Sequence, residues 1–123
     1  MAFKVDGNGN ITLIQGDSGE LIIQGLNTEQ NYTVYLAVQD KNRKPIGQEI
    51  QVQSNYRDAV TFMLTGEFTD LLQVDRNENF SVYYYGIKVC SSSSLLEDTL
   101  IFENSDIGDL NTITVYPKKV EGI

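Results

Sequence analysis

The side chains that could carry out acid–base chemistry in this sequence are carboxylates, because the chain contains no histidine. Without histidine there is no Ser-His or Cys-His nucleophile, and most zinc sites are excluded. Two acidic pairs are the remaining candidates, Glu97 with Asp98 and Asp106 with Asp109. A glycosidase needs two carboxylates that face each other across a cleft, which neighbours in one loop do not provide. We therefore expect no catalytic residues and no cofactor. A carboxylate enzyme ranks third, behind two functions that depend on binding alone.

One segment has part of a calcium-binding pattern. The spacing of Asp6, Asn8 and Asn10 matches the first half of such a loop, but the next position requires glycine and is Ile11. The position of the bidentate glutamate is taken by Asp17. The segment therefore predicts a hairpin turn and no metal ligands, and an adventitious calcium ion at the acidic loops stays an open alternative.

The single cysteine, Cys90, excludes an intrachain disulfide. A reactive thiol needs a neighbouring cation or a helix N-terminus, and Lys88 lies two residues away on the same face of a predicted strand. We interpret Cys90 as a small, half-buried packing residue.

The tyrosines are the side chains best suited to binding. A tyrosine ring supplies rigid contact area and a polar tip, which favours protein interfaces, and it also stacks on sugars. The run Tyr83-Tyr84-Tyr85 places rings on both faces of one strand. For each ring, core packing with the hydroxyl at the rim is the alternative. The candidate interaction surface consists of Tyr35, Tyr56, Tyr84 and Tyr116, of which Tyr35 and Tyr84 are expected to be the most exposed.

The elements that must position these rings are β-strands, since apolar residues alternate with a period of two in short runs between turn residues. A helical turn is expected only at 68–72. The predicted extended segments are 3–15 (a hairpin turning at 6–9), 20–24, 32–39, 46–54, 60–64, 80–90, 99–102 and 111–116.

Seven or eight short strands predict an all-β fold, an immunoglobulin-like sandwich of two antiparallel sheets, with a small β-barrel as the alternative. One domain is expected over residues 1–117, because Pro117 cannot donate to a strand ladder. Residues 118–123 are expected to form a loose C-terminal tail. In the segment 32–39, Tyr32, Val34, Leu36 and Val38 share one face. The segment 80–90 is bulky on both faces, which predicts a central, covered strand.

Charge narrows the choice of partners. The formal net charge of -8 disfavours nucleic acid and anionic membrane surfaces, which both attract clustered lysine and arginine. The sequence shows neither a signal peptide nor an apolar run of membrane-spanning length. We expect synthesis in the cytoplasm and no binding to nucleic acid or membrane.

Five segments follow one another in the order Ile14-Gln15-Gly16-Asp17-Ser18, Tyr35-Leu36-Ala37-Val38-Gln39-Asp40, Val60-Thr61-Phe62-Met63-Leu64, Tyr83-Tyr84-Tyr85-Gly86-Ile87-Lys88 and Asp98-Thr99-Leu100-Ile101. Together they resemble the N-terminal β-sandwich domain of phage baseplate upper proteins, over roughly residues 11–117. The resemblance implies a non-catalytic structural protein of a tailed phage or prophage, at the baseplate or tail or as a capsid decoration or head fibre. Its implied partners are other virion proteins in a symmetric or homo-oligomeric assembly, with docking through strand edges and tyrosine patches. It also implies a location in the virion after synthesis in the bacterial cytoplasm. A carbohydrate-binding module that uses exposed tyrosines is the alternative.

Overall fold

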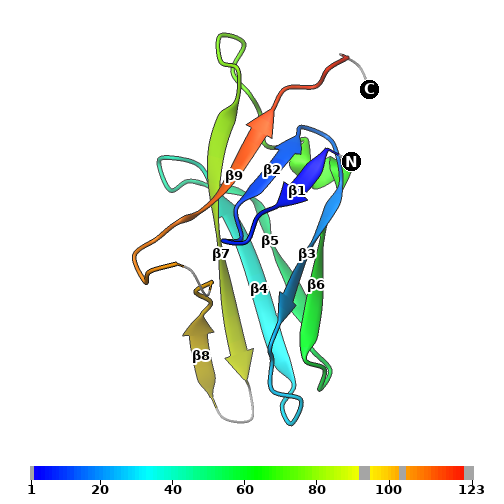
Figure 1. Ribbon diagram of the computed structural model, residues 1–123, viewed down its shortest axis with the longest axis vertical. Coiled ribbons are helices and arrows are strands. Elements are labelled where there is room, and N and C mark those ends of the chain that lie inside the picture. The colour runs from blue at the N-terminus through cyan, green and yellow to red at the C-terminus, as the bar shows by residue number, and fades with distance from the viewer. Residues whose placement is uncertain (1, 92–94, 103–104, 121–123) are drawn as a thin grey trace.

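The computed structural model describes residues 2–91, 95–102 and 105–120, and the strands lie in two packed sheets (Figure 1). The one helix within these ranges is α1 (Gly66–Thr69), which begins after the capping residue Thr65, whose hydroxyl accepts a hydrogen bond from the Phe68 amide. The described strands are β1 (Phe3–Val5), β2 (Ile11–Ile14), β3 (Gly19–Gln24), β4 (Tyr32–Gln39), β5 (Pro45–Gln53), β6 (Ala59–Leu64), β7 (Ser81–Ser91), β8 (Leu96–Thr99) and β9 (Asn111–Tyr116).

The large sheet has the strand order β1-β2-β9-β7-β4-β5, and β8 pairs with the end of β7 beyond β9. The small sheet contains β3 and β6. Within the described ranges no ladder joins the two sheets, so the architecture is the predicted sandwich and not a barrel. One pair departs from the antiparallel pattern, because β2 runs parallel to β9 with Ile11 opposite Ile113.

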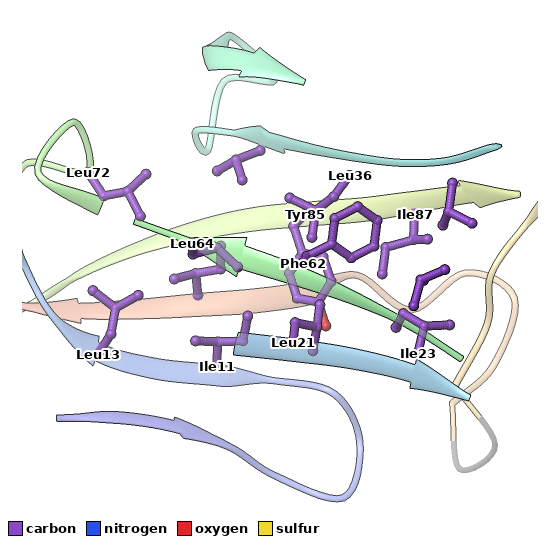
Figure 2. Close-up of a cluster of buried hydrophobic side chains, with 14 of the residues drawn as sticks. Ile11, Leu13, Leu21, Ile23, Leu36, Phe62, Leu64, Leu72, Tyr85 and Ile87 are labelled. Atoms are coloured by element: carbon purple, nitrogen blue, oxygen red, sulfur yellow. The ribbon is translucent and has the colours of Figure 1, made fainter. Parts of the chain in front are cut away.

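The core lies between the sheets and follows from the alternation of the strands. Inward side chains of β4 and β7 meet those of β3 and β6, and Phe62 sits in the middle of the cluster (Figure 2). Phe62 is completely buried. The prediction that one face of β4 points inward is confirmed, as is the central place of β7 in its sheet. The prediction that β7 is covered on both faces is wrong, because Gly86 and Lys88 on its outer face are exposed. The inward residues from these four strands are Leu21, Ile23, Tyr32, Val34, Leu36, Val38, Val60, Phe62, Leu64, Tyr85, Ile87 and Val89.

Two predicted elements are displaced. The strand expected at 99–102 is wrong, because the ladder with β7 ends at Thr99. Beyond it the Leu100 amide still donates to the Ile87 carbonyl, and Leu100 and Phe102 pack partly buried against the core. The apolar character of these two residues is therefore explained by packing against the core and not by a strand. The helical turn expected at 68–72 begins two residues earlier, at Gly66.

Two hairpin turns share one geometry. In each, an aspartate carboxylate accepts the amides two and four residues ahead, Asp6 between β1 and β2 and Asp40 between β4 and β5. The fourth residue has positive φ in both turns, 82° at Gly9 and 63° at Arg43. The predicted hairpin at 6–9 is thereby confirmed, and its carboxylate holds the turn together.

The start of the predicted tail is tied to the domain by an ion pair. Lys118 Nζ lies 2.9 Å from Asp70 Oδ1, and the Gln15 side chain donates to the Asp70 carbonyl. Residues 121–123 lie outside the described part of the chain, so the tail and the domain boundary at 117 stay predictions. Within the described ranges, the structure contains no helix that could span a membrane.

Candidate functional site

The outer face of the large sheet carries a groove of about 670 Å³ across β4 and β7. Tyr35 and Tyr84 line it on either side of Ala37 and Gly86, which form part of its floor, and beyond Tyr35 the groove continues to Cys90 and Glu97. We call this feature the tyrosine groove.

The strand register explains why these four residues meet. Tyr35 lies opposite Lys88, Ala37 opposite Gly86, and Gln39 opposite Tyr84. Because side chains alternate between the two faces of a strand, all of them point away from the core. The backbone positions of the two tyrosines are therefore four residues apart along the ladder, about 13 Å, with two of the smallest residues between them. A Cβ atom built on Gly86 would meet nothing within 4 Å, so the floor is open above the backbone.

Neighbouring strands build the walls of the groove. On one side, the register of β5 shifts against β4, so that 47–49 bulge opposite the single residue Ala37, and Glu49 lines the groove from this bulge. On the other side, β8 contributes Glu97 and Thr99, and Leu110 adds an exposed apolar side chain.

The charged groups of the groove are only partly balanced. Lys88 Nζ lies 3.1 Å from Glu97 Oε1, and this hydrogen bond together with the negative charge of Glu97 raises the pKa of Lys88. Both side chains are more than half exposed, so the pair contributes little to stability. Glu49 is exposed and has no ion pair among the residues that the structure describes. The lining therefore keeps one unpaired carboxylate.

Of the four candidate tyrosines, the structure brings two together. Tyr35 and Tyr84 line the groove but are half-buried, so they are less exposed than expected. Tyr56 is 62% exposed in the β5–β6 turn, and Tyr116 is 42% exposed at the end of β9. These last two sites lie at opposite ends of the molecule (Figure 1). Tyr116 instead packs beside Phe80, with ring centroids 5.8 Å apart.

The other two tyrosines of the Tyr83-Tyr84-Tyr85 run serve the fold. The Tyr85 hydroxyl donates to the Gly9 carbonyl, and burial, followed by the charge of Asp6, raises the pKa of Tyr85. The Tyr83 hydroxyl donates to the Gln73 carbonyl at 2.6 Å, and burial is also the main cause that raises the pKa of Tyr83. These hydroxyls connect the core to surrounding loops.

The acidic and thiol candidates have local structural contacts. Glu97 pairs with Lys88, and the Asp109 carboxylate accepts the Asp106 amide within a turn. Among the described residues, no three acidic or cysteine side chains gather as a metal site would require. Cys90 is half-buried and lines the groove beside Lys88, the same face that the sequence predicted.

The free edge of β5 is poorly suited to pairing with another strand. Its ladder is interrupted by the bulge at Gly47, whose φ is 67°. A Cβ atom at Gly47 would lie 3.1 Å from Phe68 and 3.2 Å from Leu71, so these side chains beside α1 pack against this edge. A bulge and a covering segment are common protections of an edge strand. Docking at β5 would therefore use the groove rather than the edge.

Sequence reasoning missed the floor and the walls of the groove. Gly86, a glycine within a strand of bulky residues, was the available signal, because such a glycine often marks a close approach by another molecule. Glu49 and Leu110 gave no signal, since they reach the groove only through the bulge and a distant loop.

Comparison with known proteins gives a similarity of fold. No family model and no curated protein matches the chain. The solved structure of the periplasmic chaperone SfaE is similar, with a TM-score of 0.59 and 8% sequence identity. The match covers 94% of this chain and 57% of that chain, so this chain spans little more than half of that structure's length. The fold is an immunoglobulin-like β-sandwich, as predicted.

Proposed function

We propose that this chain is a non-catalytic binding domain that docks on a partner protein through the tyrosine groove. The observation that carries the proposal is the pairing of Tyr35 and Tyr84 across an open floor of Ala37 and Gly86. Interface centres are rich in aromatic residues that fill or line pockets, and this groove has that composition.

The proposed partner is another protein of a tailed-phage or prophage particle. Support comes from the resemblance of residues 11–117 to baseplate upper proteins. The name of the similar structure is compatible with protein binding as a general role, since that protein is a chaperone. On a symmetric particle many copies bind at once, so a weak contact at each groove is sufficient. The proposed location is the virion, after synthesis in the bacterial cytoplasm.

The test compares two tyrosine variants in particles purified from the producing host. We expect the wild-type chain in the particles by mass spectrometry and about tenfold less of Tyr84→Ala, the size of loss typical of an interface anchor. Tyr56→Ala is the matched control, because it removes an exposed ring outside the groove. Absence of the wild-type chain from particles would refute the virion role. Equal incorporation of both variants would refute docking through the groove.

A carbohydrate-binding module is the second candidate, favoured by the same two rings. Sugars stack on aromatic faces, and two tyrosines in one groove provide two such faces. A glycan array with wild type and Tyr35→Ala tests this function. Binding that depends on Tyr35 would support it, and a blank array at high protein concentration would exclude it.

A further inference from the structure

We infer that the tyrosine groove receives a cationic side chain of the partner protein, arginine above all. The inference rests on the proposed function and specifies the chemistry of the partner. It starts from charge, because Glu49 and Glu97 line the groove from opposite sides and only Lys88 opposes them. A positive group of a partner would balance Glu49.

The charge around the groove favours the same kind of ligand. No lysine or arginine occurs between Lys88 and Lys118. The described part of this stretch includes β8 and the loop that brings Leu110 to the groove. Its exposed carboxylates are Glu97, Asp106 and Asp109, and also Asp98, which lies opposite the inward residue Val89 and therefore on the other face of the sheet. Carboxylates on this side of the groove attract positively charged groups before contact.

The two rings make arginine more suitable than a simple positive charge. A guanidinium group stacks on an aromatic face and can at the same time donate two parallel hydrogen bonds to a carboxylate. Tyr35 supplies an aromatic face in the groove, and Glu49 lies at the bulge opposite Ala37. Lysine can satisfy the carboxylate but does not stack in this way.

The basic turn between β4 and β5 determines where the cation would lie. Lys41, Arg43 and Lys44 follow Gln39, which lies opposite Tyr84. They repel a cation at that end. The guanidinium would therefore lie over Ala37, between Glu49 and Tyr35, and the aliphatic part of the incoming side chain would cover Gly86 and approach Tyr84.

The experiment uses the isotope-labelled full chain at low salt and two blocked tripeptides, Gly-Arg-Gly and its citrulline twin. Citrulline keeps the shape of arginine but lacks its charge. We expect the arginine peptide to shift the amide NMR signals of Ala37, Gly86 and their neighbours, and the citrulline peptide to leave them unchanged. Glu49→Gln should weaken binding about threefold, the size expected for one exposed ion pair. Glu29→Gln, an exposed carboxylate in the β3–β4 turn, is the matched control.

Each outcome of the NMR titration either supports the inference or overturns it. Equal shifts with both peptides, shifts outside the groove, or no shifts up to the solubility limit would overturn it. Shifts of the groove signals by neutral oligosaccharides in place of the arginine peptide would also overturn it, in favour of sugar binding. The particle experiment with Tyr84→Ala is separate. If Tyr84→Ala is lost from the particles while the arginine peptide gives no shifts, docking through the groove is supported and only the inference of a cationic partner side chain is rejected.

Discussion

The two faces of the β4–β7 ladder have different roles, although the same two strands form both. The inner face presents Val34, Leu36 and Ile87, all completely or nearly buried against the small sheet. The outer face presents Ala37 and Gly86 between two half-buried rings. The inner side chains fill space, and the outer ones leave it open. Stability therefore depends on one face and the proposed binding on the other, so each can be changed separately.

The largest expected effect is a cavity on the inner face. Leu36→Ala removes a side chain that is 1% exposed, so we expect a loss of about 3 kcal/mol in the free energy of unfolding, measured by urea denaturation. Tyr35→Ala on the outer face is the control and should cost clearly less, because its ring is half-buried and borders an open groove. Equal losses would contradict the division between the faces.

The next effect concerns the hydroxyl on the inner face. Tyr85→Phe leaves the buried Gly9 carbonyl without its donor, which should cost about 1–2 kcal/mol in urea denaturation. Tyr84→Phe removes the hydroxyl of a ring in the groove and should leave the free energy of unfolding almost unchanged. A larger cost for Tyr84→Phe would show that the outer hydroxyl supports the fold.

The same hydroxyl predicts a dependence on pH. Because the folded-state pKa of Tyr85 is raised above 10.0, its contribution is fully present below that pH. Above it, the unfolded chain loses the proton and the folded chain keeps it, so stability falls as pH rises. We expect the urea midpoint to decrease from about pH 9 to about pH 11, and to decrease less in Tyr85→Phe. Identical profiles for both proteins would assign the decrease to other groups whose pKa is raised, such as Tyr83 and Lys88.

Filling the two faces should give effects of opposite sign. Gly86→Thr places a β-branched residue in a strand over open space, so we expect a gain of about 0.5–1 kcal/mol and loss of binding at the groove. Val34→Phe enlarges a residue that is completely buried and should cost about 1–3 kcal/mol. Thermal denaturation of both variants checks the pair. A destabilised Gly86→Thr would mean that the floor of the groove is already filled.

The smallest expected effect is at the ion pair of the outer face. Lys88→Gln removes the contact with Glu97, and because both side chains are well exposed the free energy of unfolding should not change measurably. The neighbouring substitution Ile87→Ala, on the inner face, should cost clearly more by the same urea assay.

The sequence predicted the fold better than the site. Alternation in β4 and β7 identified the inward residues and placed Tyr35 and Tyr84 on the outer faces. Alternation is a local property, so the inward face of each strand can be predicted from the residues of that strand alone. Whether two tyrosines share a surface depends on the register between strands that are far apart in the sequence. For this reason Tyr56 and Tyr116 were grouped with them, although they lie elsewhere.

The sequence by itself determined the all-β class, the turn at Asp6, and the absence of histidine chemistry, because composition and short spacings are sufficient for these. Tertiary structure alone decided that Ala37 meets Gly86 and that Glu49 reaches their groove. It also set the parallel pairing of β2 with β9. These features arise from ladders between distant segments and from one bulge. No local pattern encodes them, because their energy depends on how all strands pack around the common core.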